Sequence, residues 1–238
     1  MFIELVDSLR CPSPHEETWL VASVTHLEGR DLVEGVLGCP VCRRQYPVRA
    51  GEVDFTAGAG TDAAPRHEAQ ASARDLERAV GGTARDLERP MSAPARVDED
   101  ALLRVRALLA LDEGGGVVLL GGGCAAWGPV LEDETQVMPL LLNAASGGEG
   151  AGRYPSALRA VDAVPLAAGA LRAAWLDAAT ATPATLAAVV RALRAGGRLV
   201  APAGAPLPPG ARELARDARE WVAECAGAAS APVPLRRR

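Results

Sequence analysis

The sequence predicts an α/β fold in which a small β-rich N-terminal module precedes a parallel sheet. The uninterrupted apolar run at residues 117–120 indicates a strand buried on both faces, which is typical of parallel sheets. A helix with one apolar face lies between two later strand candidates, as in a βαβ crossover. Three of the 5 Cys and two of the 3 His fall within residues 1–55, which sets this region apart from the rest of the chain.

Composition divides the 238 residues into three segments. Residues 1–55 form the predicted β-rich domain. Residues 56–97 are dominated by Ala, Gly, Pro, Arg and Glu, and we expect them to be a linker that is partly helical. Residues 98–238 contain the strand and helix candidates of the α/β domain. An apolar content of 49% is sufficient to fill the cores of one or two domains.

Helix boundaries in the third segment follow from capping residues. Asp98 is a good N-cap for a first helix, which the glycine run at residues 114–116 would end. Thr182 caps a second helix, with Pro183 in its first turn and Gly196-Gly197 at its end. The remaining apolar runs predict further strands at residues 137–142, 158–161, 171–176 and 198–201, and a terminal antiparallel hairpin at residues 221–224 and 233–237.

The charge balance restricts the partners of the chain. It holds 25 Arg and no Lys against 30 Asp and Glu, a formal net charge of −5. This balance argues against non-specific nucleic-acid binding. Nucleic acid is still an alternative partner, because local basic sites occur at Arg43, Arg44 and the Arg triplet at residues 236–238. No apolar run approaches the roughly 18–20 residues of a membrane helix, and the first residues do not resemble a signal peptide. We therefore expect a cytoplasmic protein without membrane contact.

The strongest candidate site is a set of four metal-binding side chains. Cys11 and His15 form one pair, and Cys39 and Cys42 form a second. Cysteines separated by two residues can bind one zinc ion from a tight turn, and three thiolates with one imidazole complete a tetrahedral site. A module of this size gains stability from such an ion. The pattern predicts a structural zinc ion bound by Cys11, His15, Cys39 and Cys42.

Other interpretations of this cluster remain open. The first pair is irregular, because Pro14 stands where a second Cys is expected, and His26 is therefore a reserve ligand. The site can also be vestigial and bind no metal. Cys39 and Cys42 can instead form a redox pair, although no thioredoxin-like βαβ pattern surrounds them. Catalytic zinc is disfavoured, because four protein ligands leave no open coordination position.

Three parts of the N-terminal segment carry a recognisable pattern: residues 5–12, the Cys39-Pro-Val-Cys42 knuckle, and residues 46–54 (Tyr-Pro-Val-Arg-Ala-Gly-Glu-Val-Asp). Together they resemble the zinc-ribbon family of methyltransferase activator subunits, which are partners of tRNA methyltransferases. The resemblance covers residues 1–55. It implies a structural zinc ion and a module that docks on class I methyltransferases and stabilises them. The chain departs from the family at Pro14 and His15, and by carrying Glu-Val-Asp at residues 52–54 where an apolar strand is usual.

Residues 117–125 (Val-Val-Leu-Leu-Gly-Gly-Gly-Cys-Ala) resemble the first motif of class I S-adenosylmethionine-dependent methyltransferases. Glycines at the end of a first strand allow the backbone to approach a cofactor closely. Residues 161–166 and 193–200 are similar to later motifs of the same family, in the same order, so the resemblance covers residues 98–205. It implies a Rossmann-like, class I methyltransferase-type fold that binds S-adenosylmethionine through Gly121, Gly123, Asn143 and Asp162.

The methyltransferase-like segment departs from the family where charge is needed. The acidic residue of the first motif aligns with Leu119, and the acidic residue that holds the ribose aligns with Asn143, which is neutral. The third glycine is Ala125, and a Gly-rich stretch at residues 146–152 stands in place of the second helix. No Asn/Asp-Pro-Pro-Tyr-like catalytic segment follows the fourth strand, where we expect Asp177 to end the strand or cap a turn.

Two functions follow from this combination. The first is a degenerate methyltransferase-like protein, a pseudoenzyme with a built-in zinc ribbon, which serves binding, regulation or assembly with weak or no catalysis. The alternative is an active S-adenosylmethionine-dependent methyltransferase of unknown acceptor. In both cases we expect the ribbon to dock on the α/β domain of its own chain. Binding to a separate protein partner is a further alternative. The candidate contacts are the apolar edge residues Val36, Leu37, Val48 and Val53.

Overall fold

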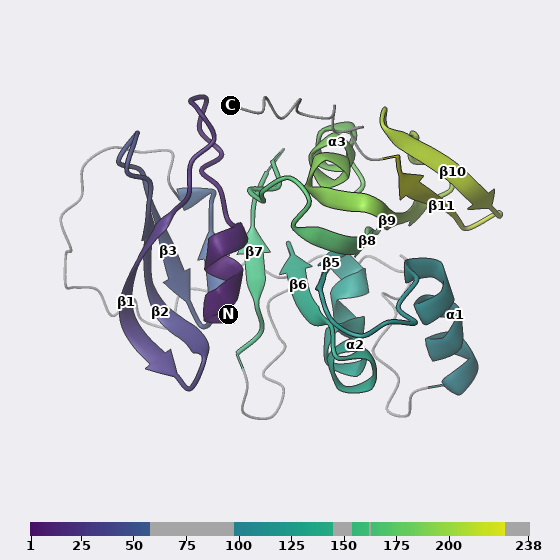
Figure 1. The fold of residues 1–238 in the computed structure, drawn as a ribbon, viewed down its shortest axis with the longest axis horizontal. Helices are drawn as coiled ribbons and strands as arrows, with labels where there is room; N and C mark the ends of the chain where they lie inside the picture. The colour runs from purple at the N-terminus through teal and green to yellow at the C-terminus, as the bar shows by residue number, and fades with distance from the viewer. Residues whose placement is uncertain (58–97, 145–153, 162, 227–238) are drawn as a thin grey trace, which may run out of the picture.

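The computed structural model describes residues 1–57, 98–144, 154–161 and 163–226. These residues form one 11-stranded sheet with the strand order β1-β2-β3-β4-β7-β6-β5-β8-β9-β11-β10, shown in Figure 1. The predicted linker at residues 56–97 lies almost wholly outside the described residues. No helix in the described ranges is long and apolar enough to cross a membrane.

The N-terminal module is β-rich, as the sequence predicts. Its strands form an antiparallel meander that begins at an edge of the sheet. A short 3-10 helix precedes the strands and contributes the buried residues Leu5 and Val6 to the core. The elements are η1 (Ile3–Ser8), β1 (Val21–Glu28), β2 (Asp31–Gly38), β3 (Gln45–Arg49) and β4 (Glu52–Asp54).

The predicted parallel sheet is confirmed, in the order β7-β6-β5-β8-β9. The chain runs outward from β5 through β6 to β7, and then returns to the other side of β5 to form β8 and β9. This reversal of strand order is the Rossmann-like topology, in which the crevice beside β5 is the usual ligand position. The strands are β5 (Val117–Gly121), β6 (Met138–Leu142), β7 (Ala157–Arg159), β8 (Leu171–Trp175) and β9 (Leu193–Pro202).

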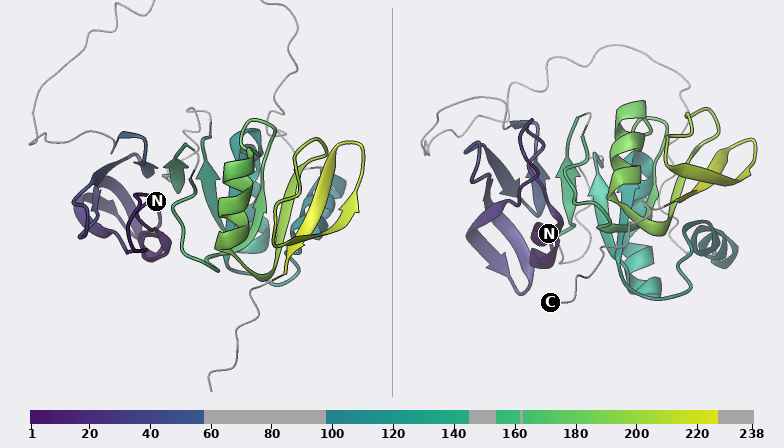
Figure 2. Two further views of the ribbon diagram at one scale, coloured as in Figure 1. Left: turned by 90° about the horizontal axis from the view of Figure 1, so that it is seen from above. Right: turned by 45° about the horizontal axis from the view of Figure 1, so that its top comes forward.

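Helices cover both faces of the parallel sheet, as Figure 2 shows. Val118 and Leu120 of β5 belong to the apolar cluster formed with α1 (Glu99–Leu109) and α2 (Gly128–Thr135). Leu119 belongs to the opposite cluster, which includes α3 (Pro183–Ala192). Successive side chains of a strand point to opposite faces, so both faces of β5 are buried. The continuous apolar run predicted this burial.

Two predicted helix starts are confirmed, and two predicted helix ends are wrong. The Asp98 side chain accepts a hydrogen bond from the Asp100 amide, and Thr182 accepts one from the Thr185 amide. The helix α1 ends before the glycine run, because Ala110 adopts a left-handed conformation. The helix α3 ends at Ala192, so that Gly196-Gly197 lie within β9.

The terminal hairpin pairs different segments from those predicted. β11 (Glu220–Cys225) contains the predicted strand at residues 221–224, but its hairpin partner is β10 (Ala211–Arg216), which precedes it. Residues 233–237 lie outside the described residues. The segment Ala-Arg-Glu-Leu-Ala-Arg consists of good helix formers, and here pairing with β11 overrides that local propensity.

The module and the parallel sheet are joined directly. β4 pairs in parallel with β7, with Val53 opposite Leu158. Beside this pair, Leu9 forms a bridge with Leu166, and the Arg10 amide donates to the Pro165 carbonyl over 2.9 Å. One apolar cluster contains residues from both parts, so the two parts share a core. Of the four predicted contact residues, Val53 lies in the joining strand itself.

Candidate metal centre and candidate cofactor crevice

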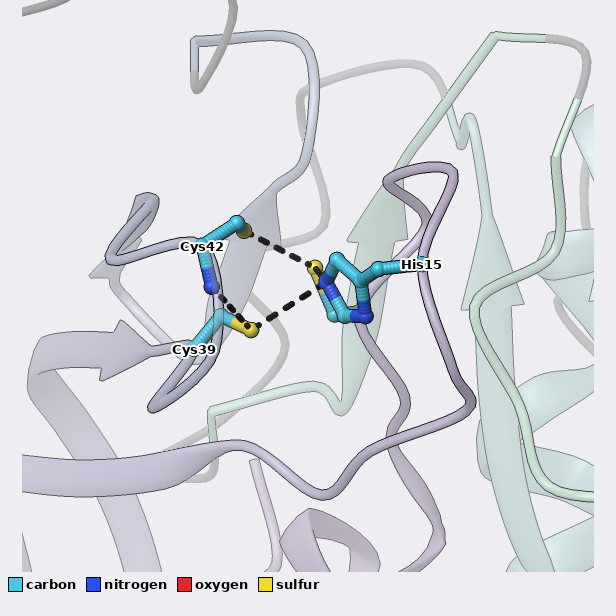
Figure 3. A group of neighbouring side chains, drawn as sticks. His15, Cys39 and Cys42 are labelled. Atoms are coloured by element: carbon cyan, nitrogen blue, oxygen red, sulfur yellow. Dashed lines mark hydrogen bonds between the residues drawn. The ribbon is translucent and has the colours of Figure 1, made fainter.

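The four side chains of the predicted zinc site converge at one end of the N-terminal module. Cys11 and His15 lie in the loop between η1 and β1, and Cys39 and Cys42 lie in the turn between β2 and β3. Their ligand atoms all lie within 4.8 Å of one another. Figure 3 shows the His15 ring facing the knuckle that carries Cys39 and Cys42.

The distances within this cluster fit a tetrahedral zinc ion. The Sγ atoms of Cys11 and Cys42 are 3.7 Å apart, and His15 Nε2 lies 3.2 Å from Cys11 Sγ and 3.4 Å from Cys39 Sγ. Tetrahedral angles with ordinary zinc bond lengths require about 3.8 Å between two sulfurs and about 3.5 Å between sulfur and nitrogen. The donor set and its spacing therefore suit zinc.

Surrounding groups hold these side chains in orientation. His15 Nδ1 donates to the Glu16 carbonyl over 2.6 Å, which leaves Nε2 directed at the thiols. The Cys42 amide approaches Cys39 Sγ at 3.5 Å, and the buried Tyr46 hydroxyl lies 3.3 Å from Cys11 Sγ. These contacts orient the side chains of His15, Cys39 and Cys11 before any metal ion binds.

The protonation of the cluster follows from the same contacts. The hydrogen bond to the Glu16 carbonyl, followed by the contact with Cys11, raises the pKa of His15 to about 9. Burial acts to raise the pKa of Cys11, but hydrogen bonds from Ser13 and Tyr46 outweigh it and lower this pKa to about 6. Without metal, the cluster therefore pairs an imidazolium with a thiolate near neutral pH.

The structure separates His26 from this cluster. His26 lies on β1 with its side chain 51% exposed, and its Nε2 is 3.2 Å from Glu28 Oε1. Cys39 and Cys42, the alternative redox pair, are free thiols, which is also the reduced state of such a pair. Convergence of a third thiol and an imidazole on this pair favours a metal site over a two-cysteine redox site.

The glycines of the resemblance lie at the crevice where the strand order reverses. Gly121 ends β5, and the 3-10 helix η3 (Gly122–Trp127) follows it at the carboxyl end of the strand. Gly122 has a φ of +56°, a left-handed conformation that glycine adopts without strain. The loop therefore has the position expected of a cofactor-binding turn in a Rossmann-like sheet.

A carboxylate of the same chain occupies the space above this loop. The Gly123 amide donates to Asp177 Oδ2 over 2.8 Å. Asp177 Oδ1 accepts hydrogen bonds from the Thr180 amide at 2.9 Å and the Thr180 hydroxyl at 2.7 Å. A Cβ atom added at Gly122 would overlap the Asp177 carboxylate, and one added at Gly121 would lie 2.5 Å from Thr180 Oγ1. The turn that follows β8 packs directly on the glycines.

Among the other predicted cofactor residues that the structure describes, Asn143 has its side-chain amide engaged within the sheet. Asn143, at the end of β6, donates to the Ala160 carbonyl over 2.8 Å and accepts from the Ala160 amide over 3.0 Å, which ties the ends of β6 and β7 together. Leu119, at the position of the family's first acid, is fully buried. Asp162 and residues 146–152 lie outside the described residues. Among the described residues, Leu119 and Asn143 therefore offer no carboxylate at their positions in β5 and beside β6.

Sequence reasoning missed the contact between Asp177 and the glycine loop. The spacing of Asp177 and Thr180 is a signal for a side-chain turn, and the capping role expected of Asp177 is present in the structure. Nothing in the local sequence indicates that the second carboxylate oxygen reaches Gly123, which is 54 residues away along the chain. That contact depends on the pairing of β5 with β8.

Comparisons with known proteins give distant structural similarities. No family model matches the chain, and no curated protein matches it. Geranyl diphosphate C-methyltransferase from Streptomyces coelicolor A3(2) is 16% identical, with a TM-score of 0.34 over 43% of each chain. A putative sarcosine dimethylglycine methyltransferase from Galdieria sulphuraria is 14% identical, with a TM-score of 0.36 over 43% of this chain and 45% of that chain.

A third similar structure is a complex between the Haloferax volcanii Trm112 methyltransferase activator and a putative methyltransferase. It is 17% identical, with a TM-score of 0.33 over 43% of this chain and 54% of that chain. The chain thus aligns with about half the length of these proteins, or less. The Rossmann-like assignment rests on the strand order of the sheet, and not on these low TM-scores.

Proposed function

We propose that this chain is a methyltransferase-like binding or assembly protein with a built-in zinc ribbon and weak or no catalysis. The observation that carries the proposal is the loss of charged cofactor contacts. Leu119 is buried where an acid is expected, and the amide of Asn143 is engaged by Ala160. Neither side chain offers a carboxylate to the amino or hydroxyl groups of a nucleoside cofactor.

The size of this loss sets the expected affinity. A hydrogen bond to a charged group contributes about 1.5–3 kcal/mol, so that two missing carboxylates remove roughly two to four decades of affinity. A cofactor that methyltransferases bind at micromolar concentrations would then bind too weakly to be retained. The proposal predicts that the full chain is isolated without S-adenosylmethionine.

Zinc is the ion that we propose for the cluster, with Cys11, His15, Cys39 and Cys42 as its ligands. The distances given above support this set, and the Glu16 carbonyl orients the imidazole in the manner of metal-ligating histidines. Four protein ligands leave no position for water or substrate, so the ion supplies folding free energy rather than chemistry. Its role is to fix the loop before β1 against the turn after β2.

The ribbon has a second role in this proposal, as an intramolecular counterpart of an activator subunit. Three backbone contacts support it: the β4–β7 pair, the Leu9–Leu166 bridge, and a 2.8 Å hydrogen bond from the Ala167 amide to the Ser8 carbonyl. Cys11 follows this bridged segment after one residue, so that a metal ligand is close to the joint. Metal binding in the ribbon therefore stabilises the α/β domain as well.

Calorimetric titration of the zinc-loaded full chain with S-adenosylmethionine tests the proposed function. No measurable heat at micromolar concentrations supports the non-catalytic role. The glycine loop beside β5 favours the alternative, an active methyltransferase that binds its cofactor through Gly121, Gly123, Asn143 and Asp162. A dissociation constant in the low micromolar range would support this alternative and contradict the proposal.

A further inference from the structure

We propose that Asp177 is a built-in ligand that closes the cofactor crevice, so that the crevice is autoinhibited by its own chain. The inference rests on the proposed function and extends it, since it names the contact that keeps the crevice closed. The crevice beside β5 is where Rossmann-like sheets bind ligands, and it lies between the ends of β5 and β8. In this chain, the turn that leaves β8 fills that position.

The carboxylate is held from two sides. On one side it accepts the Gly123 amide, and on the other it accepts the amide and hydroxyl of Thr180. The turn itself is anchored, because Thr180 is 6% exposed and Leu176 is 1% exposed. The Leu176 amide also donates to the Val200 carbonyl over 3.0 Å, within the sheet. Asp177 therefore projects from a fixed turn and not from a mobile one.

This contact also accounts for the glycines. A side chain at Gly122 would overlap the Asp177 carboxylate, and a side chain at Gly121 would lie 2.7 Å from Leu176 Cδ2. Both glycines are required by the packing of the turn, whether or not a cofactor binds. A glycine motif can thus remain in the sequence of a crevice that accepts no ligand, because the space above it is used internally.

Any ligand that reaches the Gly123 amide has to displace Asp177. A ligand with its own carboxylate is the chemical class that can replace the lost hydrogen bond and charge. S-adenosylmethionine carries such a carboxylate together with the nucleoside, and it is the probe that we choose. Replacing Asp177 with a small neutral residue removes the carboxylate that competes with the carboxylate of the probe for the Gly123 amide.

The experiment compares S-adenosylmethionine binding by the full chain, Asp177→Ala and Asp177→Asn, using calorimetry with zinc-loaded protein. The matched control is Asp54→Ala, because Asp54 closes a similar turn through the amide and hydroxyl of Thr56 at a distant position. We expect Asp177→Ala to bind at least about tenfold more tightly than the full chain, which corresponds to one recovered charge-assisted hydrogen bond. Asp54→Ala should bind like the unaltered chain.

Asp177→Asn keeps an acceptor for Gly123 and tests the inference even where the alanine variant does not fold. Hydrogen exchange at the Gly123 amide should remain slow in the unaltered chain and become at least about tenfold faster in Asp177→Asn, since a neutral acceptor bonds more weakly. Unchanged exchange would overturn the inference. A folded Asp177→Ala that binds no better than the full chain would also overturn it, while leaving the proposed function intact.

The remaining outcome separates the two proposals. Low micromolar binding by the unaltered chain, weakened by Asp177→Ala, would make Asp177 a direct contact of the cofactor. That result would overturn both the proposed function and the autoinhibitory contact. Weak binding by the unaltered chain that Asp177→Ala strengthens at least about tenfold supports both, because the carboxylates missing at Leu119 and Asn143 keep binding by the variant below that of a low-micromolar site.

Discussion

The metal cluster and the cofactor crevice are both predicted from short motifs, yet their donors are arranged differently. In the cluster, the side chains of Cys11, His15, Cys39 and Cys42 point at one another with spacings that suit zinc. In the crevice, the Gly123 amide is satisfied by the chain itself. Donor side chains at a specific spacing have few uses besides metal binding, whereas glycines provide space for any neighbour. Donor spacing is therefore the more reliable indicator of a ligand.

Loss of a metal ligand should have the largest effect. Cys39→Ser or Cys42→Ser should reduce bound zinc from about one ion per chain to almost none and destabilise the ribbon together with the α/β domain that shares its core, because binding free energies of about 10–16 kcal/mol are folding free energy in small zinc modules. Elemental analysis and circular dichroism measure both effects. The control is His26→Ala, which should retain the ion. Zinc loss in His26→Ala but not in His15→Ala would show that the ligand assignment is wrong.

Restoring the acid of the first motif should damage the fold without restoring a site. Leu119 is fully buried, so Leu119→Asp places a carboxylate in the apolar cluster and should lower the free energy of unfolding by at least about 4 kcal/mol. Denaturant unfolding measures the loss, and Leu119→Ala controls for the lost apolar volume. A stable Leu119→Asp variant that binds S-adenosylmethionine would show that the crevice is an intact cofactor site.

The joint between the two parts should be sensitive to a single apolar contact. Leu9 is fully buried in the apolar cluster that contains residues of both parts, so Leu9→Ala should cost about 2–5 kcal/mol of stability. Thermal melting should show the loss in the α/β region as well as in the ribbon, and chelation of the metal should move both transitions together. The exposed Leu103, which is 62% accessible, provides the control Leu103→Ala. Separate melting of the two parts would contradict a shared core.

The smallest effect should come from the ion pair across the joint. Arg159 Nε lies 2.8 Å from Glu52 Oε1, with side chains 46% and 32% exposed. Pairs of this exposure contribute less than about 1 kcal/mol, so Glu52→Gln should lower stability only slightly. A double-mutant cycle with Arg159→Gln measures the coupling. Coupling well above this limit would mean that charge, rather than apolar packing, fixes the β4–β7 register.

Much of the α/β region could be predicted from the sequence, because local signals there agree with tertiary structure. The run at residues 117–120 became β5, and the Asp98 and Thr182 caps start their helices. The strand β10 could not be predicted, because its charged helix-forming residues pair only in the presence of β11. The β4–β7 pair is equally non-local: sequence reasoning named Val53 of β4 as a contact but not the strand β7 that pairs with it.

The convergence of the Cys and His side chains was predictable for a similar reason. The four residues occur as two close pairs, so that each pair is positioned by one turn, and only the approach of the two turns depends on the fold. Rejection of His26 required the structure, which places it beside Glu28 on β1. The closure of the crevice by Asp177 also required it, since the bond to Gly123 joins segments that meet only when β5 and β8 pair.

Native mass spectrometry of the full chain tests the central claim most directly, because one spectrum reports both sites. The chain would be purified without chelator and measured with about 20 μM S-adenosylmethionine, which is enough to fill a low-micromolar site. The account predicts the mass of the chain with one zinc ion and no cofactor adduct. A chain that carries S-adenosylmethionine, or one that carries no zinc, would contradict it.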